Sequence, residues 1–250
     1  MEYNASKCKR MHLGYGNTKQ EYEMKVNEAG EFTTVKLKEE CEERDLGILV
    51  DSELKFSRHI QSIVAEANKI LGLIKRSFEE LDKDMFLLLY KGLVRSKLEY
   101  CVQAWSPYLK KDIISLEGVQ RRATRMIPGF ENKSYQDRLK ELNLTTLMQR
   151  RKRGDMIELY RMLHGFEKID CTKFVTINQG ERTRGSSLKL YKRRCRLDVR
   201  KYFFSQRIVN VWNSLPESVV CAPSVGSFKA RLDKVWKGND VGLQELFGSN

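Results

Sequence analysis

Closely spaced cysteines, paired histidines and long apolar runs are all absent from this sequence. Its six cysteines lie far apart with no Cys-x-x-Cys pair, which excludes a disulfide framework in a chain of 250 residues and is typical of a reducing compartment. No run approaches the roughly 20 apolar residues that cross a bilayer. The first ten residues have no apolar core of the kind that a signal peptide needs. These absences predict an intracellular protein, cytoplasmic and/or nuclear, with no membrane partner.

The motifs of common catalytic and metal sites are also absent. Cys8 and His12 have a spacing that some zinc sites use, but no second ligand pair follows them, which favours two ordinary strand residues. The segment GYGNTK at residues 14–19 lacks the GK[ST] ending of a phosphate loop and is typical of a hairpin turn. Asp82 and Asp84 favour a helix N-terminus, because they do not form an adjacent-Asp turn between strands. We therefore predict no catalytic residue, no metal site and no cofactor in this chain.

Positive charge is in excess and is unevenly distributed. The chain has 46 lysines and arginines against 33 acidic residues, which gives a net charge of +13. Residues 28–45 carry seven acidic and three basic side chains, whereas residues 181–201 carry nine basic and two acidic ones. Such a surplus favours a polyanionic partner, because a positive field concentrates phosphate chains whatever their sequence.

The hydrophobic pattern changes from strand-like to helical near Phe56. Before it, short apolar or alternating runs separated by turn residues predict a small antiparallel β-unit. After it, apolar residues three and four apart predict helices, and Pro107 ends the second of them. The predicted helices cover about 56–78, 82–105, 112–127, 134–142, 145–164, 203–213 and 224–236, and residues 166–201 predict a loop or exposed strands. The fold class expected is α+β, predominantly α-helical.

Three clusters of cations in the second half are the strongest functional signal. They comprise Arg121, Arg122 and Arg125; Arg150, Arg151, Lys152 and Arg153; and Lys192, Arg193, Arg194 and Arg196. Lys75 and Arg76 add two cations in the last turn of the first predicted helix, where they also suit the helix dipole. A solvated helix face is the plain interpretation of one such cluster, but three together favour nucleic-acid contact, by default with phosphates. Tyr191 and Tyr202 flank the third cluster, and aromatic rings near cations can stack on bases.

Several segments, in order over nearly the whole chain, carry a specific family resemblance. They are NASKCKRMHLG, ERDLGILVDSELKFSRHI, LVRSKLEYCVQAWSPYLKKDIISLEGVQRRATRMIPG, YQDRLKELNLTTLMQRRKRGDMIELYRMLHG, RIVNVWNSLPESVV and SFKARLD. Together they resemble the C-terminal third of reverse transcriptases of non-LTR retrotransposons, the LINE elements of the jockey and chicken-repeat kind. The resemblance implies that residues 1–54 are the end of a palm, residues 55–127 a thumb-like helical bundle, and residues 128–250 a basic, mainly helical extension.

The resemblance also implies roles for individual residues. Lys7 falls where the family has a lysine close to the incoming nucleotide, and Leu46 and Gly47 fall in the segment that resembles the primer grip. The family's FADD-type turn and its earlier metal-binding Asp are absent from this chain, which we expect to begin just after them. Two-metal phosphoryl transfer needs those carboxylates, so Mg²⁺ is expected only in the intact parent enzyme.

Three interpretations of the chain follow. In the first, it is the C-terminal part of a retrotransposon RNA-directed DNA polymerase that binds RNA, DNA or an RNA–DNA hybrid without catalysing synthesis alone. In the second, it is a host-retained, non-catalytic RNA- or DNA-binding protein. In the third, it is a translated transposon remnant with no function. The candidate contacts are the same for the first two: Lys7, Lys75, Arg76 and the three cationic clusters.

Overall fold

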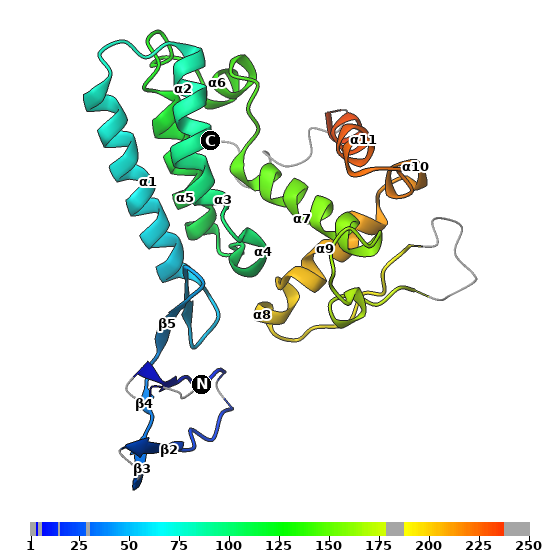
Figure 1. Cartoon of the computed structure of the whole chain (residues 1–250). Helices are drawn as coiled ribbons and strands as arrows, with labels where there is room; N and C mark the ends of the chain where they lie inside the picture. Colours follow the sequence, from blue (N-terminus) through cyan, green and yellow to red (C-terminus); the bar gives the residue numbers. More distant parts are fainter. Residues whose placement is uncertain (1–3, 5–6, 15, 29–30, 179–187, 238–250) are drawn as a thin grey trace. The chain divides into compact units, whose positions relative to one another are not determined.

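The structure is a computed structural model that describes residues 4, 7–14, 16–28, 31–178 and 188–237 (Figure 1). Helix accounts for 53% of the chain and strand for 11%, which confirms the predominantly α-helical α+β class. The chain divides into two compact units, Met1–Ser62 and Ile63–Asn250. Helices from both sides of residue 127 pack together in the second unit, and the predicted palm, thumb and extension bounds stay predictions.

Unit 1 contains three two-stranded sheets among its described residues. β2 (Glu23–Glu28) pairs antiparallel with β3 (Glu31–Lys36), as expected for this region. The second antiparallel hairpin, β5 with β6, pairs Glu42–Asp45 with Ile48–Asp51. β1 (Lys9–Arg10) and β4 (Lys38–Glu39) form a two-residue parallel pair, which the sequence pattern did not predict.

The connection from β6 to α1 (Ser57–Ser77) is held by side chains at both of its ends. The carboxylate of Asp51 accepts the backbone amide of Phe56 at 2.7 Å. In the first turn of α1, His59 is 3% exposed and its Nδ1 accepts the amide of Leu49 at 3.3 Å. The start of α1 is therefore fixed to the β5–β6 hairpin by hydrogen bonds as well as by apolar contact.

The long apolar helix predicted over residues 82–105 is interrupted. It consists of α2 (Lys83–Leu89), a π-helical turn η2 (Tyr90–Arg95), α3 (Ser96–Glu99) and α4 (Val102–Trp105). Asp82 accepts the amide of Met85 at 2.8 Å, the helix-start role that its sequence predicted. Cys101, between α3 and α4, has a φ of +53° and is exposed, whereas Trp105 at the end of α4 is 1% exposed.

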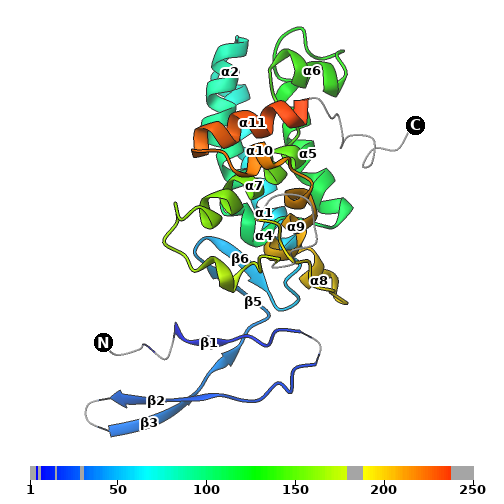
Figure 2. The same cartoon turned by 90° about the vertical axis from the view of Figure 1, so that its right-hand side faces the viewer.

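α7 (Leu147–Leu163) is the helix that most of unit 2 packs on. It contacts α4 and α5 (Lys110–Thr124), and it also contacts α9 (Phe204–Asn213) and α11 (Val225–Lys237) (Figure 2). Its predicted start is confirmed, because Thr146 and Gln149 form a capping box. The largest fully buried side chains around it include Tyr160, Trp212 and Phe228.

Shorter helices complete unit 2. They are α6 (Tyr135–Glu141), the 3₁₀ turn η3 (Cys171–Lys173), α8 (Asp198–Lys201) and α10 (Glu217–Val220). Part of the basic segment expected to form a loop or strands, residues 179–187, lies outside the described residues, and Ile177 and Leu190 beside it form an isolated antiparallel bridge. Within the described ranges, no helix is both long and apolar enough to cross a bilayer.

The contact between His59 and Leu49 predicts a pH dependence for unit 1. Burial, and then the charge of Arg44, lower the pKa of His59 below its ordinary value of 6.5. The unfolded chain therefore takes up the proton first, and the free energy of unfolding should fall as the pH drops below 6.5 and level off below the folded-state pKa. Urea unfolding of the wild type, followed by NMR signals of the β5–β6 hairpin, measures this fall.

The control is the His59→Gln variant, whose side chain does not titrate. Between about pH 8 and pH 5, its stability should change less than that of the wild type. Identical pH profiles for the two proteins would contradict this role for His59.

Candidate nucleic-acid interface

The outward face of α5 carries cations and no exposed carboxylate. Both acidic residues of this helix, Asp112 and Glu117, are turned inward and are only 3% and 2% exposed. The exposed or half-buried basic residues of α5 and its C-terminal cap are Lys110, Lys111, Arg121, Arg122 and Arg125. We call these five residues the α5 cationic face. Because its acids are buried, this face is positive at both ends of the helix and carries no exposed carboxylate between them.

The C-terminal half of α1 extends this surface. Arg122 donates to the Oδ1 of Asn68 on α1 from both Nε, at 3.1 Å, and Nη2, at 2.9 Å, which joins the two helices side by side. Lys75 and Arg76, in the last turn of α1, are exposed and form no ion pair within the described residues. The Arg122 guanidinium lies across the surface of Gly118, where the helix has no side chain. The structure therefore brings the first predicted cluster together with Lys75 and Arg76.

Arg121 differs from its neighbours in the cluster because it is half-buried. Its guanidinium lies 4.7 Å from the ring centroid of Tyr135, and its backbone carbonyl accepts a hydrogen bond from Arg138. Arg125, in contrast, is exposed at the end of α5. Arg122 and Arg125 are therefore the two members of the predicted cluster best placed to meet a phosphate.

The second predicted cluster, Arg150–Arg153, is mostly engaged inside the protein. Arg150 forms a two-pronged ion pair with Glu99 of α3, and Arg153 forms one with Asp233 of α11, with N–O distances of 2.6 and 2.8 Å. Arg151 is 4% exposed, so the prediction that it contacts phosphate is wrong. Only Lys152 of this run is exposed. The run looked like a solvated polar stretch because the sequence does not show where its carboxylate partners lie.

A second buried ion pair fastens α9 to α7. Nε and Nη2 of Arg207 donate to the two carboxylate oxygens of Asp155 at 2.8 and 2.9 Å, and Nη2 also donates to the carbonyl of Gln103 in α4 at 3.2 Å. Burial lowers the pKa of Arg151 to about 10, so this guanidinium stays charged at neutral pH. Its positive charge lies near both Asp155 and Glu117.

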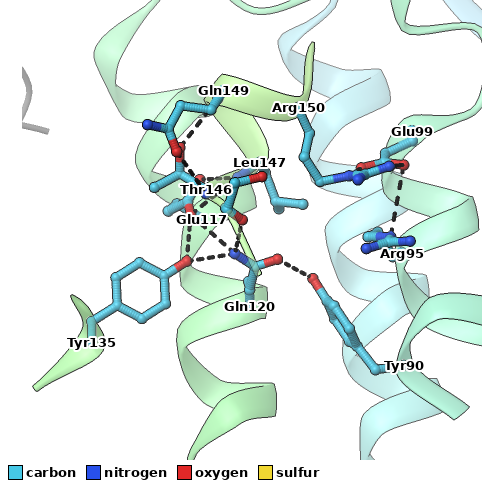
Figure 3. A network of polar contacts seen from close by, with 11 residues as sticks. Tyr90, Arg95, Glu99, Glu117, Gln120, Tyr135, Thr146, Leu147, Gln149 and Arg150 are labelled. Carbon is cyan, nitrogen blue, oxygen red and sulfur yellow. Dashed lines mark hydrogen bonds and ion pairs between the residues drawn. The ribbon is translucent and has the colours of Figure 1, made fainter. Parts of the chain in front are cut away.

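A buried network of polar side chains holds the start of α7 against α5 and α6 (Figure 3). Both carboxylate oxygens of Glu117 accept the amide of Leu147, at 3.3 and 3.1 Å, and one accepts the hydroxyl of Tyr135. Gln120 accepts the hydroxyl of Tyr90 at 2.6 Å and donates to the Tyr135 oxygen at 2.8 Å. Burial raises the pKa of Glu117, while its hydrogen bonds and Arg151 oppose that shift. A carboxylate at this helix start also matches the α7 dipole.

The third predicted cluster is exposed. Lys192, Arg193, Arg194 and Arg196 have exposed side chains and form no ion pair among the residues that the structure describes. Arg193 donates to the hydroxyl of Thr176 at 3.3 Å. Tyr191, before the cluster, is 55% exposed, and Tyr202, after it, is 37% exposed. The third cluster therefore remains available for the contact predicted from the sequence.

The remaining predicted residues belong to unit 1. Lys7 lies in a short turn with an exposed side chain. Leu46 and Gly47 form the two-residue turn between β5 and β6, with φ angles of +45° and +86°, and Leu46 is 81% exposed. Positive φ at both positions is the geometry of a type I′ hairpin turn. A projecting apolar side chain on a tight turn is compatible with contact to a partner, and the primer-grip role stays a prediction.

Some cations of the surface were missed in the sequence. Lys110 and Lys111 begin α5, and Arg200 and Lys201 lie in α8; all four side chains are exposed. The signal for the first pair was the lysine dipeptide at the start of an amphipathic helix with arginines on its polar side. No such signal existed for the second pair, because α8 is a single turn.

No metal-dependent step is assigned to these residues. Two-metal phosphoryl transfer needs several carboxylates around a shared site. Across the described ranges, no group of three or more histidine, cysteine or acidic side chains could hold a metal ion. The donors present therefore do not fit the Mg²⁺ site that the family resemblance implies for an intact polymerase.

Comparisons with known proteins leave the family open. No protein-family model matches the chain, and no solved structure matches it. An uncharacterised protein of Caenorhabditis elegans is 27% identical over 123 residues. That match covers 48% of this chain and 60% of the worm protein, so it spans less than two thirds of the relative. The site is therefore interpreted from its own residues.

Neighbouring cations on α7 should differ sharply in their effect on stability. Removing Arg151 leaves Asp155 and Glu117 with less compensation in a buried region, so we expect Arg151→Ala to lower the free energy of unfolding by about 3 kcal/mol. Lys152→Ala, which removes an exposed side chain, should change it by less than about 0.5 kcal/mol. Urea unfolding followed by tryptophan fluorescence measures both. Equal stability of the two variants would contradict the structural role of Arg151.

Proposed function

We propose that this chain binds an RNA–DNA hybrid duplex through the α5 cationic face and the end of α1. The observation that carries the proposal is the distribution of charge on α5, where both carboxylates are buried and the basic residues face outward. Phosphate contacts of this kind are sequence-independent and arise from lysine and arginine side chains on a shared surface.

The family resemblance supports a more specific form of the proposal. In it, the chain is the thumb and post-thumb region of a non-LTR retrotransposon reverse transcriptase, and it holds the duplex while the catalytic carboxylates belong to another part of the intact enzyme. We accordingly propose no polymerase activity for these 250 residues alone. Lys75, Arg76, Arg122 and Arg125 are the phosphate contacts in this scheme.

The basic side chains fall into two groups, those paired with carboxylates and those without a carboxylate partner among the described residues. This division predicts which cations bind the duplex, which composition alone does not. Arg150 and Arg153 are matched by Glu99 and Asp233, so they contribute little to the external field. Arg122 and Arg125 have no carboxylate partner among the described residues. Binding should therefore depend on α5 and α1 rather than on the longest basic run of the sequence.

Alanine substitution of Arg122 and Arg125 together should weaken binding of an RNA–DNA hybrid and flatten its dependence on salt. Each lost phosphate contact should reduce the slope of log affinity against log salt by roughly 0.9, because fewer counterions are released on binding. Fluorescence anisotropy with a labelled blunt hybrid, at several salt concentrations, measures the slope.

Lys97→Ala is the matched control for this experiment. Lys97 is an exposed cation whose Nζ lies 2.9 Å from Glu66 of α1, so it is already paired. Its substitution should leave both the affinity and the slope nearly unchanged. If the wild type fails to bind the hybrid at low salt, or if the Lys97 and Arg122/Arg125 variants lose affinity equally, the proposal is wrong.

A further inference from the structure

Two tyrosines that are distant in the sequence stack on one another beside the start of α5. Tyr108, two residues before α5, and Tyr202, at the end of α8, have ring centroids 4.8 Å apart and planes only 2° from parallel. Tyr202 is 37% exposed, and Phe203 next to it is 41% exposed. We call Tyr108, Tyr202 and Phe203 the aromatic platform.

The aromatic platform is held in place by the interior of unit 2. Arg207, whose guanidinium is paired with the buried Asp155, also donates from Nη1 to the backbone carbonyl of Tyr202 at 3.3 Å. The same side chain donates to the carbonyl of Gln103, which lies five residues before Tyr108. One half-buried arginine thus contacts both segments of the chain that carry the stacked rings. Rigid rings lose little conformational entropy when a partner stacks on them.

Cations surround the aromatic platform. Lys201 lies over the ring of Tyr202, 5.2 Å from its centroid, and Arg200 lies over the ring of Phe203 at 5.7 Å, so a base that stacks on either ring takes the place of a mobile cationic side chain. The segment 192–203 carries six basic residues and one carboxylate, that of Asp198. Lys110 and Lys111 lie two and three residues after Tyr108 and belong to the α5 cationic face. The platform therefore adjoins the surface proposed for the duplex, along a helix that spans roughly 22 Å.

We propose that the aromatic platform binds single-stranded polynucleotide, and in particular the single-stranded extension of a duplex held on α5. Unpaired bases offer flat faces that stack on aromatic rings, while lysines and arginines beside the rings contact the phosphates that link them. Paired bases inside a duplex cannot reach such a platform without unstacking. This inference rests on the proposed function in one respect only: the duplex is what brings the extension to the platform.

The chemistry favours a polynucleotide over an acidic peptide. The cations alone would attract either polyanion, since a positive field does not distinguish them. The exposed rings of Tyr202 and Phe203 add a contact that only the bases of a polynucleotide exploit repeatedly along a chain. Aspartate and glutamate side chains have no aromatic ring to stack on them.

The test compares three hybrids bound by the full 250-residue chain: a blunt duplex, the same duplex with an extension of about six nucleotides, and the same duplex with an abasic extension. The two extensions carry equal phosphate charge and differ only in their bases. We expect the base-containing extension to bind about tenfold more tightly than the abasic one. Fluorescence anisotropy at constant salt measures the difference.

Substitutions in the aromatic platform test whether it causes the difference in affinity between the base-containing and abasic extensions. Tyr202→Ala and Phe203→Ala should each reduce the preference for bases, whereas Tyr202→Phe, which keeps the ring, should preserve it. The affinity of each variant for the blunt duplex reports whether its fold is intact. Tyr22→Ala, which removes a 52% exposed tyrosine of unit 1, is the matched control and should leave the preference unchanged.

Three results would overturn the inference. They are equal binding of the two extensions by the wild type, an equal loss for Tyr202→Phe and Tyr202→Ala, and displacement of the extension by a polyglutamate peptide as readily as by a single strand. Failure of the duplex proposal looks different, because the blunt hybrid would then not bind at all. In that case, free single strands with and without bases still test the platform.

Discussion

The burial of charge along α7 is the constraint on which unit 2 depends. Asp155 and Arg151 of this helix are nearly inaccessible to water, and Arg207 of α9 reaches Asp155 with two hydrogen bonds. Charges removed from water must be matched, because an unpaired buried ion costs far more than the pair contributes. The positions of α4, α7 and α9 are therefore coupled, because the Arg207 guanidinium that pairs with Asp155 also donates to the backbone carbonyl of Gln103 in α4.

The same constraint applies at the N-terminal end of α7, where the buried carboxylate is Glu117 of α5. Glu117 is drawn inward by the amide of Leu147 and the hydroxyl of Tyr135, and this leaves the opposite side of α5 without negative charge. The interior packing and the exterior field are thus two consequences of one arrangement. The outer surface of α5 is basic because both of its acidic residues are buried, and one of them, Glu117, accepts the backbone amide at the start of α7.

The sequence predicted the class of fold and many helix positions, because the apolar spacing of α1, α5, α9 and α11 reports directly on buried faces. It did not predict the break at Cys101, which depends on a single left-handed residue. It also overestimated how many cations of the run Arg150–Arg153 are available to phosphates. A run of like charges in the sequence shows neither which side chains are buried nor which distant carboxylates they pair with. Glu99 and Asp233 lie 51 and 80 residues from the arginines that they pair with, so only tertiary structure reveals these contacts.

For the candidate interface, the spacing of residues in the sequence was informative where the exposed cations lie on a single helix. The spacing of Arg121, Arg122 and Arg125 identified the polar side of α5, although the half-buried position of Arg121 under Tyr135 could not be foreseen. The stacking of Tyr108 on Tyr202 joins residues 94 positions apart, beyond the reach of any periodicity. Long-range pairings of this kind are what a single sequence conceals.

The central claim is that exposed cations of α1 and α5 meet nucleic acid while those of α7 do not. Lysine-reactive labelling of the wild-type chain, read by mass spectrometry with and without a saturating RNA–DNA hybrid, tests it most directly. The account predicts that the hybrid protects Lys75, Lys110 and Lys111 and leaves Lys152 and Lys97 as reactive as before. Protection of Lys152 with continued reactivity of Lys110 and Lys111 would contradict it.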